Sequence, residues 1–274
     1  MIDKTSLDQR YADLYRDAAT DAEAADRLCR VIAVLRRECP WDMVQTHESL
    51  RKCLLEEAYE ACDAIDRKDA ANLREELGDV LMQVILNSEI ASETGKFTFT
   101  DVANEECEKM IRRHPHVFST EEAKTVDKVL EKWENIKSKE HGNTSYAHRL
   151  NDVPLALPAL LRSAKVQKRA ADVGFDWSDI SGPIAKVAEE TSEFINADRI
   201  ADRAAMQEEL GDLFFSVVNV SRLAGFDPEE TLNKATDKFI KRFEMLEKRA
   251  AADGRDLNDL SLAELDALWN EVKK

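Results

Sequence analysis

Two stretches of the chain, LLEEAYEACDAI at residues 54–65 and EELGDVLMQV at residues 75–84, decide its fold. In both stretches apolar residues recur every three to four positions, which is the spacing that predicts amphipathic α-helices. Each stretch also carries two acidic residues three positions apart. Residues at that spacing project from the same side of a helix, so each stretch is expected to present a pair of carboxylates on one face.

The same two stretches occur again 133 residues further along the chain. EETSEFINAD at 189–198 corresponds to EEAYEACDAI at 56–65, and EELGDLFFSVV at 208–218 corresponds to EELGDVLMQVI at 75–85. The repeated acidic residues are Glu57, Glu60, Glu76 and Asp79 in the first half, and Glu190, Glu193, Glu209 and Asp212 in the second. A single acidic pair at this spacing is common by chance in a chain with 55 acidic residues, but two pairs repeated in both halves are not.

Helical periodicity extends along nearly the whole chain, and the scarcity of Gly (8) and Pro (6) agrees with it. Helices are expected near residues 20–38, 46–67, 70–95, 99–113, 126–140, 158–172, 181–199, 202–224, 229–253 and 261–273. The alternating KFTFT at 96–100 is too short and isolated to build a sheet. The sequence therefore predicts an all-α protein made of two helical-bundle modules.

The periodicity lapses over residues 138–158, where Gly142, Asn143, Pro154 and Pro158 gather. Such residues are typical of turns and loops. We therefore expect four segments: an N-terminal extension at 1–23, a first module at 24–137, a linker at 138–157 and a second module at 158–274.

The four acidic residues of each half are candidate metal ligands. An antiparallel helix pair would bring both carboxylate pairs together, which is how helical bundles build metal sites. A site made only of carboxylates favours a hard cation, so Mg²⁺ is expected, with Mn²⁺ as a substitute. Gly78 and Gly211 lie inside these helices, where Gly is unfavourable, and suggest the close approach of another helix.

Each half also repeats a set of basic and aromatic residues. A lysine and an arginine four positions apart share a helix face and could hold phosphate oxygens. A tryptophan four positions before a lysine could stack on a nucleobase while the lysine reaches a phosphate. The candidates are Lys109, Arg113, Trp133 and Lys137 in the first half, and Lys238, Arg242, Trp269 and Lys273 in the second. Singly, such residues are usually surface or core positions, and only their repetition favours a substrate-binding role.

Composition argues against several classes of function. A formal charge of −16 would repel nucleic acids and anionic membranes, so neither is an expected partner. The N-terminal stretch lacks the features of a signal peptide, and no apolar run is long enough to span a membrane. Five cysteines without a C-x-x-C pair fit a reducing cytoplasm better than a disulfide framework or a zinc site. The glycines do not form a phosphate-binding loop, so a nucleotide would be held by metal and side chains.

Several of these motifs together resemble the MazG family of nucleoside triphosphate pyrophosphohydrolases. The first half contributes CPWDMVQTHESL (39–50), LLEEAYEACDAI (54–65), EELGDVLMQV (75–84) and RRHPHVF (112–118), and the second contributes VAEETSEFINA (187–197), EELGDLFFSVV (208–218) and the closing LWNEVKK. The resemblance covers about residues 24–274. It implies an all-α tandem protein that forms a homodimer, uses Mg²⁺ and splits NTPs or dNTPs into the monophosphate and pyrophosphate, an activity suited to cleaning the nucleotide pool.

The resemblance also implies roles for particular residues. The family's metal ligands carry over to the eight repeated acids, and its substrate contacts carry over to the repeated basic and aromatic residues. It favours the second module as the main catalyst, with Glu190 and Glu209 as catalytic residues. Either Glu57 or Glu190 could orient the attacking water, and the sequence does not separate a metal ligand from a general base.

Two other interpretations remain open at this point. One is a related pyrophosphohydrolase that acts on dUTP or phosphoribosyl-ATP, although the tandem modules and the CPWD and HPHVF motifs argue against it. The other is a binding or regulatory protein whose acidic sites are vestigial. The sequence indicates neither the preferred base and sugar nor any particular regulatory partner.

Overall fold

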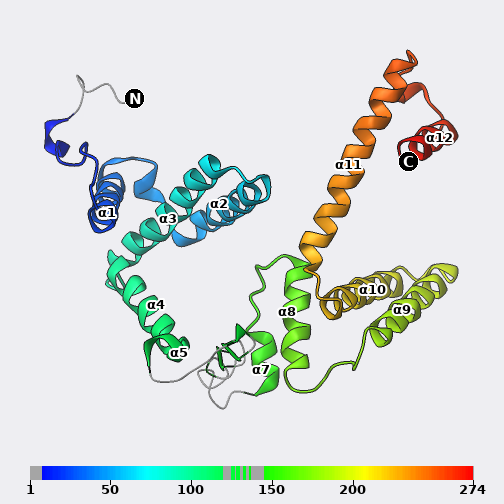
Figure 1. Ribbon diagram of the computed structural model, residues 1–274, viewed down its shortest axis with the longest axis horizontal. Helices are drawn as coiled ribbons and strands as arrows, with labels where there is room; N and C mark the ends of the chain where they lie inside the picture. Colours follow the sequence, from blue (N-terminus) through cyan, green and yellow to red (C-terminus); the bar gives the residue numbers. More distant parts are fainter. Residues whose placement is uncertain are drawn as a thin grey trace. The chain divides into compact units, whose positions relative to one another are not determined.

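The computed structural model describes residues 8–119, 125–126, 128–129, 132–133, 136 and 145–273. The chain divides into two compact units, Met1–His141 and Gly142–Lys274 (Figure 1). Every regular element in the described ranges is an α-helix or a short 3-10 helix. The predicted all-α fold is therefore confirmed.

The first unit is built on the pairing of α2 with α3. Its elements are η1 (Gln9–Tyr11), α1 (Asp21–Glu38), η2 (Asp42–Val44), α2 (His47–Arg67), α3 (Ala70–Ser92), α4 (Phe99–Arg113) and α5 (Pro115–Phe118). Helix α1 packs on α3 and α4 leads away from the end of α3 (Figure 1). The apolar core consists of Ile32, Leu50, Ile85 and Leu86, all of which are buried.

The second unit repeats this arrangement with α9 and α10 as the central pair. Its elements are α7 (Tyr146–Asn151), α8 (Ala159–Ala171), α9 (Ser181–Arg199), α10 (Arg203–Leu223), α11 (Pro228–Ala252), η3 (Leu257–Asp259) and α12 (Leu262–Val272). Helix α8 packs on α10, as α1 packs on α3 in the first unit. Helix α12 packs back on the long α11 around Leu246, Ala250 and Leu268 (Figure 1).

The reversal between the paired helices is the same in both units. Lys68 and Ala201 both have a positive φ, of 57° and 55°; Lys68 caps the end of α2, and Ala201 lies two residues after the end of α9. The next residue, Asp69 or Asp202, accepts hydrogen bonds from two backbone N–H groups and caps the following helix. Because the connection is so short, the second helix returns antiparallel to the first and brings the two acidic pairs together.

The predicted linker is not free of structure. The boundary between the two units falls within residues 138–157, but Tyr146–Asn151 of this segment forms α7, which packs on α8. Val153 just beyond it is fully buried. The helix is only six residues long, so it leaves too little periodicity to be detected in the sequence.

Two predicted segments, the helix at 126–140 and the N-terminal extension, are only partly described by the structure. The predicted helix at 126–140 lies largely outside the described residues, as does Lys137, although Val126 and Trp133 within it are helical. The described part of the predicted N-terminal extension packs on α1: Leu14 is buried and its carbonyl oxygen accepts a hydrogen bond of 2.8 Å from Arg27 Nε.

The prediction that another helix lies close to Gly78 and Gly211 is wrong for the described part of the chain. A Cβ placed on either glycine would meet no other described atom within 4 Å. Each glycine therefore borders open space beside the acidic residues rather than a tightly packed helix. In the part of the chain that the structure describes, no helix is both long and apolar enough to cross a membrane.

Candidate functional site

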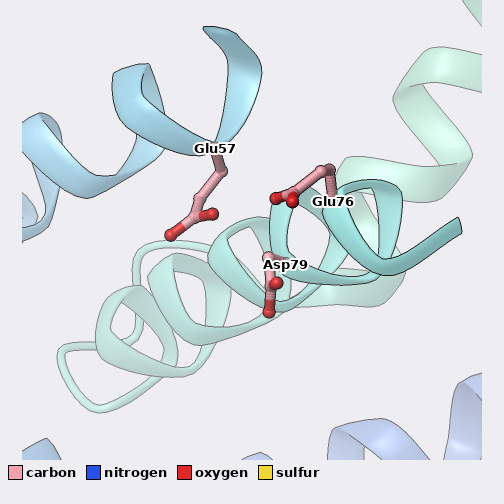
Figure 2. Close-up of side chains that lie close together, drawn as sticks. All are labelled: Glu57, Glu76 and Asp79. Atoms are coloured by element: carbon pink, nitrogen blue, oxygen red, sulfur yellow. The ribbon is translucent and has the colours of Figure 1, made fainter. Parts of the chain in front are cut away.

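The first unit brings three of its four repeated acids to one point. Glu57 on α2 and Glu76 and Asp79 on α3 each offer a carboxylate oxygen, and these oxygens lie within 4.8 Å of one another (Figure 2). Glu76 is buried, whereas Glu57 and Asp79 are half-buried. Glu60 is not part of this close group, but its charge helps to raise the pKa of Glu76.

The second unit forms the corresponding group from Glu190 and Glu193 on α9 and Glu209 on α10. One carboxylate oxygen from each also lies within 4.8 Å of the others. Glu190 is the most buried of the three, with 3% of its surface exposed. Asp212 stands outside this close group, yet it contributes to the raised pKa of Glu209. In each unit, therefore, three predicted ligands converge closely and the fourth lies near them.

The acids of each group repel one another in the absence of a cation. Burial is the main cause that raises the pKa of Glu76, Glu57 and Glu209, and the charges of neighbouring acids raise it further. A bound divalent cation would offset both effects. Because every donor in these groups is a carboxylate oxygen, the residues present fit a hard cation such as Mg²⁺.

Lys186 distinguishes the second acidic group from the first. Its Nζ lies 2.5 Å from Glu190 Oε1 and 2.9 Å from Glu189 Oε1. Lys186 lowers the pKa of Glu190, and the two glutamates raise the pKa of Lys186. Lys186 was not among the residues predicted from the sequence, although the two halves differ visibly at this position, where the first half has Cys53.

A cavity of about 470 Å³ lies beside the second acidic group. Its lining includes Gln167, Phe175, Trp177, Glu190, Asp212 and Asn219. In the first unit the position that corresponds to Asn219 is Leu86, which is buried in the apolar core. This cavity was not predicted from the sequence, because its lining comes from α7, α8, α9, α10 and the loop before α9.

The predicted basic and aromatic residues of the second half lie on α11 and at the C-terminal end of α12. The Trp269 ring packs on Phe239, with ring centroids 5.0 Å apart, and Lys273 Nζ lies 5.8 Å from the Trp269 ring centroid. No hydrogen bond or ion pair found between described residues joins Lys238, Arg242 or Lys273 to the acids of α9 and α10. The structure thus brings Trp269 and Lys273 together, but not with the acidic group.

Of their counterparts in the first half, Lys109 and Arg113 lie on α4, and Trp133 lies beside Arg113. The Arg113 guanidinium lies 5.5 Å from the Trp133 ring centroid, and the His114 ring meets the same tryptophan at 4.8 Å between centroids. Lys109 forms an ion pair with Glu106 on its own helix. Arg113 and Trp133 are therefore neighbours in the structure.

The fold and the acidic groups define a class of protein. It is a tandem all-α protein in which each helical hairpin brings several carboxylates together. The family model described as the MazG nucleotide pyrophosphohydrolase domain matches residues 45–118 and 181–246, and each match contains one acidic group. This chain belongs to the MazG family. The resemblance seen in the sequence motifs is confirmed.

Individual relatives are similar over most of their length. The nucleoside triphosphate pyrophosphohydrolase of Escherichia coli (strain K12) is 41% identical over 254 residues, which cover 91% of this chain and 97% of the relative. The nucleoside triphosphate pyrophosphohydrolase/pyrophosphatase MazG of Thermotoga maritima is 43% identical over 235 residues, covering 86% and 89%. The crystal structure of a mazG-related protein from Thermotoga maritima matches 41% of this chain and 98% of its own, with 28% identity and a TM-score of 0.37.

Proposed function

We propose that this protein is a nucleoside triphosphate pyrophosphohydrolase that converts NTPs and dNTPs into the monophosphate and pyrophosphate, mainly in its second unit. The observation that carries this proposal is the convergence of carboxylates from two helices at corresponding places in both MazG domains. Relatives named nucleoside triphosphate pyrophosphohydrolases, similar over 91% and 86% of this chain, support the substrate class. Such an activity would serve to remove unwanted nucleotides from the pool.

The donor chemistry supports Mg²⁺ as the cofactor, with Mn²⁺ as a substitute. Its proposed ligands are Glu190, Glu193, Glu209 and Asp212 in the second unit, and Glu57, Glu60, Glu76 and Asp79 in the first. When bound, the ion would neutralise phosphate charge and lower the pKa of a coordinated water.

Glu190 and Glu209 are the proposed catalytic residues. The reaction adds one water across the anhydride between the α- and β-phosphates, so a group must accept the proton of that water. Lys186 lowers the pKa of Glu190, which keeps this carboxylate ionised and able to accept a hydrogen bond from water. Glu57, whose pKa is raised instead, is the alternative water-orienting residue in the first unit.

Two differences between the units support the second as the main catalyst. The second acidic group has a resident cation, Lys186, where the first half has Cys53. It also borders a cavity, whereas the first unit places Leu86 of its packed core at the position of Asn219. The cavity beside the second acidic group gives room for a substrate as large as a nucleotide.

The basic and aromatic residues are proposed to contact the substrate from a second copy of the chain. They are Lys238, Arg242, Trp269 and Lys273, with the first-half counterparts Lys109, Arg113, Trp133 and Lys137. On α10 the side chains of Leu210, Phe214 and Val217 share one face and are all exposed, and Gly211 borders open space. Covering this face in a homodimer would bury apolar surface and could carry α11 toward the partner's acids.

Product analysis tests this function. The full chain is incubated with each common NTP and dNTP, together with dUTP and phosphoribosyl-ATP, in the presence of Mg²⁺, and the products are separated by ion-exchange chromatography. We expect the monophosphate and pyrophosphate, and no turnover in the presence of a chelator. Orthophosphate as the first product, or activity that resists chelation, would contradict the proposal. A lack of turnover on all substrates would favour a regulatory protein.

A further inference from the structure

The cavity beside the second acidic group is lined by both aromatic and amide side chains. Its volume of about 470 Å³ lies within the usual range for small-molecule sites. Phe175 and Trp177 come from the loop before α9, and Phe215 comes from α10. Glu190 and Asp212 also border it, so the cavity is continuous with the acidic group.

Gln167 on α8 lines this cavity and carries an unsatisfied acceptor. Only 5% of the residue is exposed, and its Nε2 donates a hydrogen bond of 2.7 Å to the carbonyl oxygen of Phe215. A carbonyl oxygen can only accept, so this bond fixes which end of the amide is Oε1. That Oε1 is buried and accepts no hydrogen bond from any described residue. A buried acceptor without a donor is costly, and this one belongs to a residue that lines a cavity able to hold a ligand.

Asn219 on α10 presents the complementary donor. Arg222 donates to Asn219 Oδ1 from its Nε at 3.0 Å and from a terminal nitrogen at 2.7 Å. The same guanidinium binds both carboxylate oxygens of Asp176. These bonds orient the Asn219 amide with its oxygen toward Arg222, so its Nδ2 is left to donate elsewhere. The Asp176–Arg222 pair also ties the aromatic loop to α10.

The position of Trp177 depends on Gly182. A Cβ on Gly182 would lie 2.0 Å from Trp177 Cδ1 and 2.5 Å from Cγ, so only a glycine allows the ring to rest on the start of α9. Trp177 is 44% exposed and borders the cavity, which leaves it able to contact a planar ligand.

We propose that this cavity binds the nucleobase of the substrate, with Gln167 Oε1 accepting a hydrogen bond from a base N–H and Asn219 Nδ2 donating to a base acceptor. Every common nucleobase offers both groups beside each other, and a flat aromatic lining suits its faces. A base held there would place its phosphates toward Glu190 and Asp212. The inference rests on the proposed function, because it takes a nucleotide as the substrate.

Binding of nucleoside monophosphates to Gln167→Leu tests the inference without depending on turnover. Isothermal titration of the full chain with AMP, GMP, CMP and UMP, and separately with pyrophosphate, is carried out in the presence of Mg²⁺. We expect the Kd of the best-bound monophosphate to rise about tenfold or more, since the acceptor of a buried hydrogen bond is lost. Pyrophosphate should bind as before.

Gln83→Leu is the matched control. Gln83 is a buried glutamine of the first unit whose Oε1 likewise accepts no hydrogen bond from the described residues, but it does not border the cavity. Its variant should bind monophosphates as the wild type does. Asn219→Leu installs the residue that the first unit carries at this position, and it should also weaken monophosphate binding.

The outcomes separate this inference from the proposed function. If the wild type hydrolyses NTPs but neither Gln167→Leu nor Asn219→Leu changes monophosphate binding, the base binds elsewhere and the inference is wrong. The same holds if Trp269→Ala alone weakens binding. If monophosphates bind through Gln167 but NTPs are not hydrolysed, the cavity is assigned correctly and the proposed function is wrong. If Gln167→Leu fails to fold, the result for Asn219→Leu decides.

Discussion

Two glutamates at equivalent positions of the repeat have pKa values that are shifted in opposite directions. Glu57 and Glu190 correspond in the repeat, yet the pKa of Glu57 is raised, chiefly by burial, while the pKa of Glu190 is lowered by the hydrogen bond that it accepts from Lys186. The cause is a single difference four residues upstream, Cys53 against Lys186. One acidic group therefore has an internal cation, whereas no ion pair between described residues joins a lysine or arginine to Glu57, Glu76 or Asp79.

Replacing single proposed metal ligands should show which unit is catalytic. We predict that Glu209→Gln lowers kcat by about 100-fold or more, because even residues that merely orient metal ligands cost about 10- to 100-fold when lost. Glu76→Gln should lower it less. Steady-state assays of both variants check this, with light scattering and melting curves as controls for folding. Equal losses in two folded variants would mean that the first unit is catalytic or tightly coupled to the second.

The stability of the metal-free protein should depend on pH through Glu209. Its pKa is raised above 4.5 in the folded protein, so its contribution to stability is present at low pH and is lost as the pH rises through that raised value. Glutamine does not titrate. The melting temperature of Glu209→Gln, measured in chelator, should therefore equal that of the wild type near about pH 4 and exceed it increasingly at higher pH.

Glu190→Gln provides the opposite sign as a control. The folded-state pKa of Glu190 is lowered, so its contribution is present above 4.5 and is lost as the pH falls through the lowered value. This variant should melt below the wild type at neutral pH. If both variants shift in the same direction at neutral pH, the difference that we assign to Lys186 is wrong.

At the scale of the element, the two acidic hairpins depend on their tight reversals. Asp69 and Asp202 each cap the second helix of a hairpin and follow a residue in the left-handed conformation. These caps fix where α3 and α10 begin. They thereby fix which turn of the second helix faces the acids of the first.

Removing either cap should destabilise its own unit by about 1 kcal/mol. We predict this loss for Asp202→Ala and for Asp69→Ala, measured as a shift in the urea midpoint followed by circular dichroism. Asp198→Ala is the control, because Asp198 is an exposed acid near the same turn whose side chain makes no hydrogen bond in the structure. A similar loss in the control would show that charge rather than capping is responsible.

At the scale of the whole molecule, each central hairpin leaves one apolar face uncovered. Phe214 on α10 is 58% exposed and its counterpart Leu81 on α3 is 41% exposed. Leu210 and Leu77 lie one turn earlier on the same faces and are also exposed. Surfaces of this kind commonly mark sites of association.

We predict a homodimer, with a mass by light scattering of twice the 31.1 kDa of the chain. Phe214→Glu should shift the equilibrium toward the monomer, because it places a charge in the apolar face that would be buried. Glu208→Gln, which alters a charge without touching that face, serves as the comparison. A wild-type protein that remains monomeric at working concentration would show that the dimer interface does not exist.

Much of the fold followed from the sequence. The observed α1, α2, α9 and α10 begin and end within a residue of the predicted bounds, because long amphipathic helices with capping residues carry strong local signals. The pairing of the acidic helices also followed, since a repeated spacing of acids has few structural explanations. The six-residue α7 and the open space beside Gly78 and Gly211 did not, because the first is too short to show a period and the second depends on distant atoms.

The sequence by itself determined the all-α class, the repeat, the family and the acids that converge, because each of these follows from local residue patterns or from their repetition. Only the tertiary structure revealed that Gln167 and Asn219 border one cavity beside the acids. Gln167 and Asn219 lie 52 positions apart on different helices. Their proximity depends on how α8 packs on α10, and such packing is decided by the shapes of whole faces rather than by any spacing along the chain.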